Sequence, residues 1–445
     1  MTMPPPESGP RDVLSVADLR DIWLILPPAD RIEGFKLLER REAESFFQEL
    51  STRAQAELML AMPPDQRRRW MRILPPDDAA DLIQAVGAEH KAELLGALDE
   101  VGRKEVSALL AYADDAAGGL MNPRYARLRP EMTVDEAISD LRKQARAKLE
   151  TLYYAYVLDE QQHLLGVVSF RELFAAQPRT PVRDLMHTHV MTVRDDQDQE
   201  SVSRVFAQQD LIAVPVIDAE NRMKGIVTVD DIVDVVQEEA TEDIQKFGGM
   251  QALDAPYLST AFLSMVKKRG GWLAVLFLGE MLTASAMAHF QDEIARAVVL
   301  ALFVPLIISS GGNSGSQAST LVIRAMALDE LRLRDWWRVV RREVAAGLTL
   351  GLVLGSIGFL RIVLWQLFSP LYGAHYVLIA LTVAFSLIGV IVFGTVTGSL
   401  LPLLLHRLGF DPASASAPFV ATLVDVSGLV IYFSVASILL NGTLL

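Results

Sequence analysis

The amino-acid sequence predicts a multidomain membrane protein. It has an all-α superhelical N-domain, a tandem α/β pair, a connecting helix and a five-helix α transmembrane domain. Three observations predict this: an apolar position recurs every 12 residues, one strand–helix pattern occurs twice, and five long apolar runs fill the C-terminal part. The 445 residues suffice for about three domains. We expect a disordered lead-in at 1–10, a helical-repeat domain at 11–119, α/β domains at 120–182 and 183–246, a connecting helix at 239–268 and the transmembrane domain at 270–445.

The first domain is predicted from its repeat. The repeating apolar positions are Leu26, Leu38, Leu50, Met62, Leu74, Val86, Leu98 and Leu110. Pro-Pro follows this position at 27–28, 63–64 and 75–76. Proline suits the first turn of a helix and breaks its interior, so each pair separates one helix from the next. The pattern indicates a stack of short helices, each burying one face on its neighbours.

The middle of the chain contains two copies of one α/β unit. The apolar strand Tyr154–Leu158 is matched by Ala213–Ile217, and both are followed by Asp. Gly166-Val-Val-Ser169 is matched by Gly225-Ile-Val-Thr228, a strand that leads into a helix. This duplicated pattern resembles a pair of CBS domains, which usually sense a small ligand and catalyse no reaction.

From residue 270 onward the chain is predicted to cross a membrane. Its apolar runs lie at about 271–290, 297–326, 339–368, 376–405 and 416–440. Each is long enough to cross ~30 Å of hydrocarbon, so membrane lipid is an expected partner. Arg and Lys collect before the first run and in the second-to-third loop, which places the N-terminal part in the cytoplasm and the C-terminus outside.

Charge is unevenly distributed between the two parts. Residues 1–265 hold 46 of the 55 acidic residues and 29 of the 41 Lys and Arg residues, a balance of 29 − 46 = −17. The remaining 9 acidic and 12 basic residues give the C-terminal part a balance of +3. An acidic soluble part argues against nucleic acid as a partner, because phosphates would be repelled, and it favours cations. The chain has no Cys, which excludes disulfides and thiolate metal sites.

Asp425 is the main candidate for a functional residue in the membrane. It lies inside the fifth apolar run. A carboxylate at a helix centre costs roughly 2.5–3.5 kcal/mol on insertion scales, so it marks a water-filled cation path or is satisfied by a neighbouring helix. Ala421 and Gly428 share its helix face, and small residues there would permit close packing or access to a pore. Glu280, in the first run, is a second membrane carboxylate, either a pore or interface group or simply hydrogen-bonded.

The second and fourth runs are rich in glycine. In the second, Ser309–Gln317 contains three glycines and Asn313, which predicts either a loosened helix lining water or a packing face. In the fourth, Gly394 and Gly398 form a GxxxG pattern, a weak signal of helix contact.

The densest acidic stretch precedes the membrane. Residues 195–246 hold fourteen carboxylates against four Lys and Arg residues. A solvated face is one interpretation. The other is a gate: packed carboxylates repel, cations bound between them would stabilise a compact arrangement, and removing the cations would spread the domains. Oxygen ligands suit Mg²⁺, which keeps several waters and needs one or two carboxylates per site.

Taken together, the motifs resemble the MgtE family of magnesium channels from end to end. They are Ala116-Ala-Gly-Gly-Leu-Met121, Gly225-Ile-Val-Thr-Val-Asp-Asp231, Glu239-Ala-Thr-Glu-Asp-Ile244, Gly311-Gly-Asn-Ser-Gly315 and Asp425-Val-Ser-Gly428. The resemblance implies a homodimer in a bacterial inner membrane, with the pore on the dimer axis and a "plug" helix at 239–268. It implies that hydrated Mg²⁺ is held by Asp425 near Asn313, with Gly312 and Ala421 beside it.

The resemblance also implies regulatory Mg²⁺ sites. The matching acidic positions are Asp198, Glu200, Asp210, Asp230, Asp231, Asp234, Glu239, Glu242 and Asp243, with Asp77 and Asp81 in the helical domain. A further acidic position of that domain is Ser45 here. Family CBS pairs can bind ATP, and Thr228 with Asp231 matches the nucleotide pattern, whereas the first copy has Glu172 after Ser169.

The leading hypothesis is a channel that takes up Mg²⁺ and is closed by Mg²⁺ bound to the acidic domains. An ion-coupled transporter of divalent cations is the alternative, because a buried Asp and a broken second span would serve it equally well. An enzyme is disfavoured, since no nucleophile–base pair, His cluster or P-loop is visible in the sequence.

Overall fold

The computed structural model describes residues 16–444 except residues 24, 148, 254, 256, 259 and 370. The lead-in predicted at 1–10 lies outside the described residues. The chain divides into two compact units, Met1–Gln237 and Glu238–Leu445, which are described separately here.

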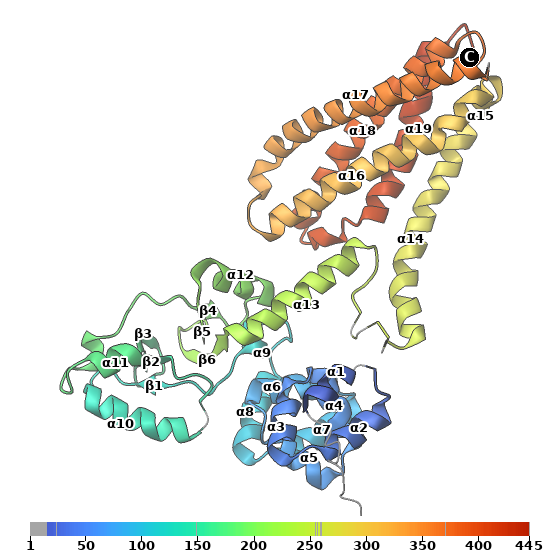
Figure 1. Cartoon of the computed structure of the whole chain (residues 1–445). Helices are drawn as coiled ribbons and strands as arrows, with labels where there is room; N and C mark the ends of the chain where they lie inside the picture. Colours follow the sequence, from blue (N-terminus) through green and yellow to red (C-terminus); the bar gives the residue numbers. More distant parts are fainter. Residues whose placement is uncertain are drawn as a thin grey trace, which may run out of the picture. The chain divides into compact units, whose positions relative to one another are not determined.

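The first part of unit 1 is a stack of short helices (Figure 1). They are α1 (Val16–Ile22), α2 (Pro28–Leu37), α3 (Arg40–Glu49), α4 (Thr52–Ala61), α5 (Pro64–Met71), α6 (Pro76–Ala85), α7 (Ala88–Ala97) and α8 (Glu100–Leu109). From α2 onward a helix begins every 12 residues, and the prolines of α2, α5 and α6 occupy the first turn. The repeat buries its large apolar side chains, including Phe47, Met59 and Leu82. The predicted all-α repeat is confirmed.

Two three-stranded units follow the short helix α9 (Ala117–Leu120). The first contains β1 (Arg127–Leu128), α10 (Val134–Gln144), β2 (Tyr154–Leu158), β3 (Leu164–Ser169) and α11 (Phe170–Ala175). The second contains β4 (Val193–Arg194), α12 (Gln199–Gln209), β5 (Ala213–Ile217), β6 (Met223–Thr228) and the start of α13 (Val229–Phe247). In each, the first strand pairs in parallel and the other two form an antiparallel pair whose register shifts near the turn. The predicted duplication is therefore confirmed.

The connecting helix differs from its prediction at 239–268. The helix α13 starts directly after β6, already at Val229, and ends at Phe247. The helix ends because Gly248 and Gly249 follow. Gly249 has a backbone φ of 74°, a value that residues other than glycine rarely adopt. An added Cβ at Gly249 would also lie 2.9 Å from Cδ1 of Trp272. The next helix begins at Phe262, so no single helix spans the predicted range.

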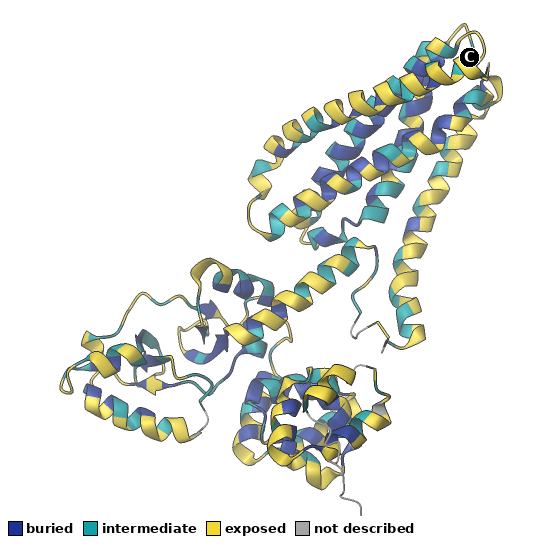
Figure 2. Ribbon diagram, in the orientation of Figure 1, coloured by how far each residue is buried: buried dark blue, intermediate teal, exposed yellow. Residues whose placement is uncertain are grey.

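Unit 2 contains five helices in its described residues that are long and apolar enough to cross a membrane. They are α14 (Phe262–His289), α16 (Val304–Ala327, preceded by a 3₁₀ turn at Val298–Phe303), α17 (Trp336–Phe368), α18 (Tyr376–Arg407) and α19 (Ala417–Leu440), with the short α15 (Gln291–Arg296) after α14. These helices coincide with the five predicted spans. Figure 2 shows that α14 is mainly exposed along its length, whereas α18 is largely buried among its neighbours.

The second span is not broken, contrary to one of the two expectations for it. The helix α16 runs without interruption through Ser309–Gln317. Two of its glycines lie at the contact with α18, where an added Cβ on Gly394 or Gly398 would lie less than 3 Å from the carbonyl oxygen of Gly311 or Gly315. The glycines therefore remove side-chain bulk at a helix crossing and do not free the backbone. The contact predicted from the GxxxG pattern of α18 is confirmed.

Candidate functional site

A polar stripe runs along the exposed side of α16. Ser309, Asn313, Gln317 and Thr320 are spaced by three or four residues and are exposed, while the opposite face is buried. Nδ2 of Asn313 lies 3.5 Å from Oγ of Ser309. Lipid tails cannot form hydrogen bonds with such groups, so this stripe belongs against water or protein.

The helix α19 carries Asp425 to the side of this stripe. An added Cβ on Gly312 would lie 3.5 Å from Cα of Ala421, so α16 and α19 touch at these two residues. Ala421 lies one turn before Asp425, and the Asp425 residue is only half-buried. Of the predicted residues, Gly312 and Ala421 are thus in contact, and Asn313 and Asp425 each lie within about one helical turn of this contact.

The helix α14 contacts the neighbouring face of α19. An added Cβ on Gly279 would lie 2.9 Å from Cγ2 of Thr422, and the next residue, Glu280, has its carboxyl group within hydrogen-bonding reach of Asp425. Glu280, whose role the sequence left open, is therefore adjacent to the main candidate residue.

A second group of carboxylates forms in unit 1, where α6 meets the start of α13 and the segment before β2. Its members are Asp77, Asp78, Glu150, Asp230, Asp231 and Asp234. Asp77 is only 6% exposed. Nδ2 of the buried Asn122 donates to Oδ1 of Asp77 at 3.1 Å and to Oε2 of Glu150 at 2.6 Å. We call these six acidic residues the carboxylate cluster.

Burial and mutual repulsion shift the pKa values of the carboxylate cluster upward. Burial, with the charges of Asp231, Asp78 and Glu150, raises the pKa of Asp77 well above its usual value. Burial raises the pKa of Asp78 to about 6, helped by Asp230 and Asp234. Burial raises the pKa of Asp231 to about 7, although Oγ1 of Thr228 donates to Oδ2 of Asp231 at 2.7 Å. These shifts mean that the cluster favours bound protons or cations.

The sequence missed three members of this site. Asp78 follows a predicted residue directly, but Glu150 and Asn122 come from segments far from α6 and α13 in the chain. The pKa of Glu150 is also raised, by burial and the charges of Asp230 and Asp78, against the lowering effect of Arg124. Of these three residues, only Asp78 could have been predicted from the sequence, because it is adjacent to Asp77.

Two other predicted acidic residues have partners within α12. Asp198 caps α12 by accepting from the backbone N–H of Glu200 at 2.9 Å, and Glu200 pairs with Arg204 at 2.9 Å. Asp210 ends α12 with a φ of 50°. Asp81, Glu239 and Asp243 are also engaged in contacts.

The end of α13 is attached to the segment that leads into α19. Nζ of Lys246 pairs with Glu242 and, at 2.7 Å, with Oδ2 of Asp411. Burial lowers the pKa of Lys246, but the hydrogen bonds that it donates to Asp411 and Glu242 outweigh this effect and raise its pKa. Nε1 of Trp272 donates to Oγ of Ser416 at 3.2 Å, next to the same segment. Unit 2 thus links α13 physically to the start of the helix that carries Asp425.

Within the described part of the chain, no group of three or more His, Asp or Glu side chains is arranged to ligate a bare metal ion. Mg²⁺ in proteins takes one or two carboxylates as ligands and keeps several of its waters. Both carboxylate groups fit a hydrated divalent cation by charge and by their oxygen donors.

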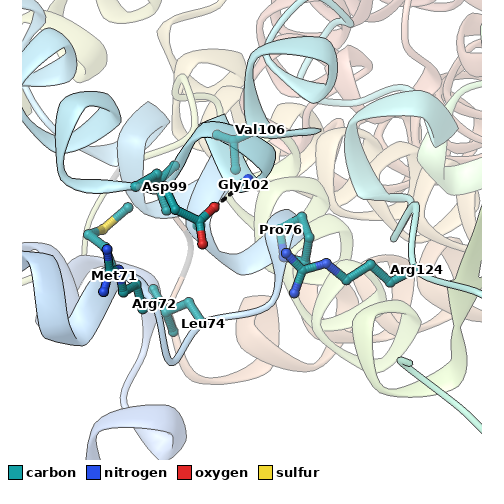
Figure 3. Close-up of a pocket in the computed structure, with 10 residues that line it drawn as sticks. Met71, Arg72, Leu74, Pro76, Asp99, Gly102, Val106 and Arg124 are labelled. Atoms are coloured by element: carbon teal, nitrogen blue, oxygen red, sulfur yellow. Dashed lines mark hydrogen bonds between the residues drawn. The ribbon is translucent and has the colours of Figure 1, made fainter. Parts of the chain in front are cut away.

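A separate cavity of about 320 Å³ lies in unit 1 (Figure 3). It is lined by Met71, Leu74, Val106 and the charged Arg72, Asp99 and Arg124, among others. Asp99 accepts from the backbone N–H of Gly102 and so caps α8. None of the predicted cation-site residues is among the residues that line this cavity.

Comparison with known proteins identifies the chain. Residues 304–435 match the model of the MgtE divalent cation transporter, residues 14–115 match the MgtE intracellular N domain, and residues 117–179 and 182–238 match CBS domains. The magnesium transporter MgtE of Thermus thermophilus is 44% identical over 345 residues, which cover 78% of this chain and 74% of that protein. The chain belongs to the MgtE family. Because this is a family of divalent cation transporters, the chain is a multi-pass transport protein and not an enzyme.

Another relative and a solved structure are also similar to this chain. The magnesium transporter MgtE of Enterococcus faecalis is 35% identical over 338 residues, 76% of this chain and 72% of that protein. Among solved structures, the cytosolic domain of the Mg²⁺ channel MgtE in complex with ATP is 42% identical, covers 50% of this chain and 90% of that one, and has a TM-score of 0.47.

Proposed function

We propose that this MgtE protein is a channel for Mg²⁺ uptake that closes when Mg²⁺ binds to its acidic soluble part. The observation that carries the proposal is the polar stripe of α16 beside Asp425, within a bundle of mainly apolar helices. The names of the relatives, which are magnesium transporters, support Mg²⁺ as the ion.

The exposed position of the stripe supports a homodimer with the pore between its copies. In a single chain, Asn313 is exposed and Asp425 is half-exposed at membrane depth. Contact with lipid would be costly for these groups, whereas a water-filled path between two copies would hydrate them. One Asp425 from each copy would then face the same hydrated ion.

The carboxylate cluster supports the regulatory half of the proposal. Its desolvated acids have raised pKa values, so a bound divalent cation would relieve their burial and repulsion together. Cation binding would therefore hold the helical domain and the second CBS domain in one arrangement. The contacts of Lys246 with Asp411 provide a route from α13 to the start of α19.

The coupled-transporter alternative loses one of its two supports. The broken second span that favoured it is a continuous α16, so only the membrane carboxylates remain in its favour. Nucleotide binding at Thr228 and Asp231 stays a prediction: Thr228 donates to Asp231, and Asp231 also belongs to the carboxylate cluster. We place the N-terminal part in the cytoplasm of a bacterium and the C-terminus outside its inner membrane, on the charge of the loops.

The Asp425→Asn variant tests the pore assignment. Purified protein is reconstituted into vesicles that contain a Mg²⁺-sensitive dye, and Mg²⁺ is added outside. We expect uptake to fall to that of protein-free vesicles, because the neutral amide cannot hold a hydrated dication in the membrane.

The Asp329→Asn variant, in the loop after α16, is the matched control and should transport like the wild type. Wild-type uptake by a monodisperse Asp425→Asn protein would remove the pore assignment.

A further inference from the structure

Three helices meet around Asp425. Ala421 contacts α16 through Gly312, and Thr422 contacts α14 through Gly279. Successive residues of a helix are about 100° apart, so Asp425 points about 40° from Ala421 and about 60° from Thr422. Asp425 therefore projects between α16 and α14, and not towards one of them alone.

Glu280 lies at the same depth as Asp425. The predicted spans of α14 and α19 start at residues 271 and 416, so both carboxylates lie nine residues inside (280 − 271 and 425 − 416). At 1.5 Å per residue this is about 14 Å, near the middle of a ~30 Å hydrocarbon layer. The first and fifth of five spans cross in the same direction, so equal offsets mean equal depth. The contact of Gly279 with Thr422 agrees with this register.

The position of Glu280 on a membrane helix is not compatible with contact to lipid alone. The residue is exposed in the single chain, although its neighbours on α14 are apolar. A glutamate facing hydrocarbon is costly, and membrane carboxylates normally face water or a partner group. Its carboxyl group lies within hydrogen-bonding reach of that of Asp425, and neither carboxylate forms an ion pair with a Lys or Arg side chain of the described residues.

We propose that Glu280 is a second carboxylate of the membrane cation site, and that it acts together with Asp425 on one hydrated divalent cation. Two like charges in contact at this depth repel each other, and a dication between them removes the repulsion. The carboxylate pair thus favours a divalent over a monovalent ion. This inference rests on the proposed role of Asp425 and adds a residue to its site.

The test compares Glu280→Gln and Glu280→Ser with Glu280→Asp in reconstituted vesicles. Loss of one carboxylate should raise the Mg²⁺ concentration at half-maximal flux by about tenfold or more, because one of two Coulomb partners is gone. Glu280→Asp keeps the charge and should restore most of the affinity. Glu343→Gln is the matched control: this glutamate lies on the membrane helix α17, which packs on α18, and it should leave the half-maximal concentration unchanged.

The outcomes separate the two proposals. The inference is correct if either neutral variant that elutes as a monodisperse protein shows the shift, and if Glu280→Asp restores most of the affinity. Wild-type affinity in the neutral variants, with Asp425→Asn inactive, would overturn the role of Glu280 and leave the pore assignment standing. Wild-type flux in Asp425→Asn would instead overturn the proposed function itself.

Discussion

At the scale of single residues, buried carboxylates dominate the soluble unit. Asp77 lies in the first turn of α6, where an acidic side chain normally favours the helix. Here it is buried against Asp231 and Asp78, and this burial raises its pKa. Its burial among like charges is therefore not explained by the stability of its own helix, and it fits the cation site that we propose for this cluster.

Replacement of Asp77 by Asn should stabilise the protein when Mg²⁺ is absent. The amide keeps the hydrogen bond from Asn122 but removes a desolvated charge, so we expect about 1 kcal/mol of stability, or roughly 2–4 °C in Tm. Thermal unfolding in EDTA and in excess Mg²⁺ measures the effect, and the gain of stability from Mg²⁺ should shrink.

The matched control is Asp65→Asn, since Asp65 occupies the same first-turn position of α5 but is exposed. It should not stabilise the protein. If Asp77→Asn destabilises it in EDTA, the carboxylate cluster is not under the repulsion that we infer.

Glu172 is a carboxylate with the opposite behaviour. Hydrogen bonds from Ser169, with a contact of 2.7 Å from Nε2 of His187, lower its pKa to about 2. The folded-state pKa lies below the unfolded value of about 4.3, so Glu172 stabilises the fold above about pH 4.3 and loses this effect as the pH falls towards 2.

Glu172→Gln should therefore lower Tm at pH 7, by a small amount because the group is partly exposed. The difference from the wild type should narrow between about pH 4 and pH 2. Thermal unfolding of the detergent-solubilised chain across this range is the measurement. A constant difference at all pH values would mean that ionisation of Glu172 is not the cause.

At the scale of elements, helix packing in the membrane rests on glycine. Gly311 and Gly315 of α16 face Gly394 and Gly398 of α18 so closely that a single Cβ would collide with a backbone carbonyl. This contact positions α16, and with it the polar stripe.

Gly398→Val should disturb the α16–α18 contact. Overpacking typically costs about 1–3 kcal/mol, and the obstacle here is backbone that cannot rotate away. We expect a lower unfolding midpoint and lower Mg²⁺ flux. Gly271→Val on α14 is the control, because no atom lies within 4 Å of its added Cβ. Equal midpoints for the two variants would contradict the packing role.

The same elements show what a sequence can and cannot predict. The 12-residue repeat and the five spans are local periodicities, so the helices could be predicted closely. The course of the chain at Ser309–Gln317 was left open, because glycines can loosen a helix or let it approach a neighbour, and only the position of α18 decides between them. The sequence did not predict the end of α13, because the residues on both sides of Gly248 and Gly249 follow a helical pattern. Two glycines within such a pattern do not by themselves show that the helix ends there.

The site residues likewise divide into those that the local sequence indicates and those that depend on contacts between distant segments. Asp425 could be identified because a carboxylate stands out in an apolar run. Asp77 and Asp231 were expected as separate family positions, and their burial against each other depends on how the helical domain meets the second CBS domain. Glu150 and Asn122 could not be predicted, since nothing in their local sequence distinguishes them from surface residues. The position of Glu280 beside Asp425 likewise depends on the contact between two helices that are distant in sequence.

At the scale of the whole molecule, an acidic soluble unit and a membrane bundle are joined through α13. The carboxylate cluster favours bound cations, and the end of α13 contacts the segment before α19 through Lys246 and Asp411. Under the proposed function, Mg²⁺ acts on both units, as the regulator of the soluble unit and as the ion that passes Asp425.

The most direct test records current from membrane patches that contain the purified chain, while Mg²⁺ is raised on the side of the soluble unit. We expect a Mg²⁺ current that is absent in Asp425→Asn, stops as this Mg²⁺ rises, and persists when Glu239, Glu242 and Asp243 are neutralised together. Mg²⁺ uptake without any resolvable current, or a current that ignores Mg²⁺ on the soluble side, would contradict the account.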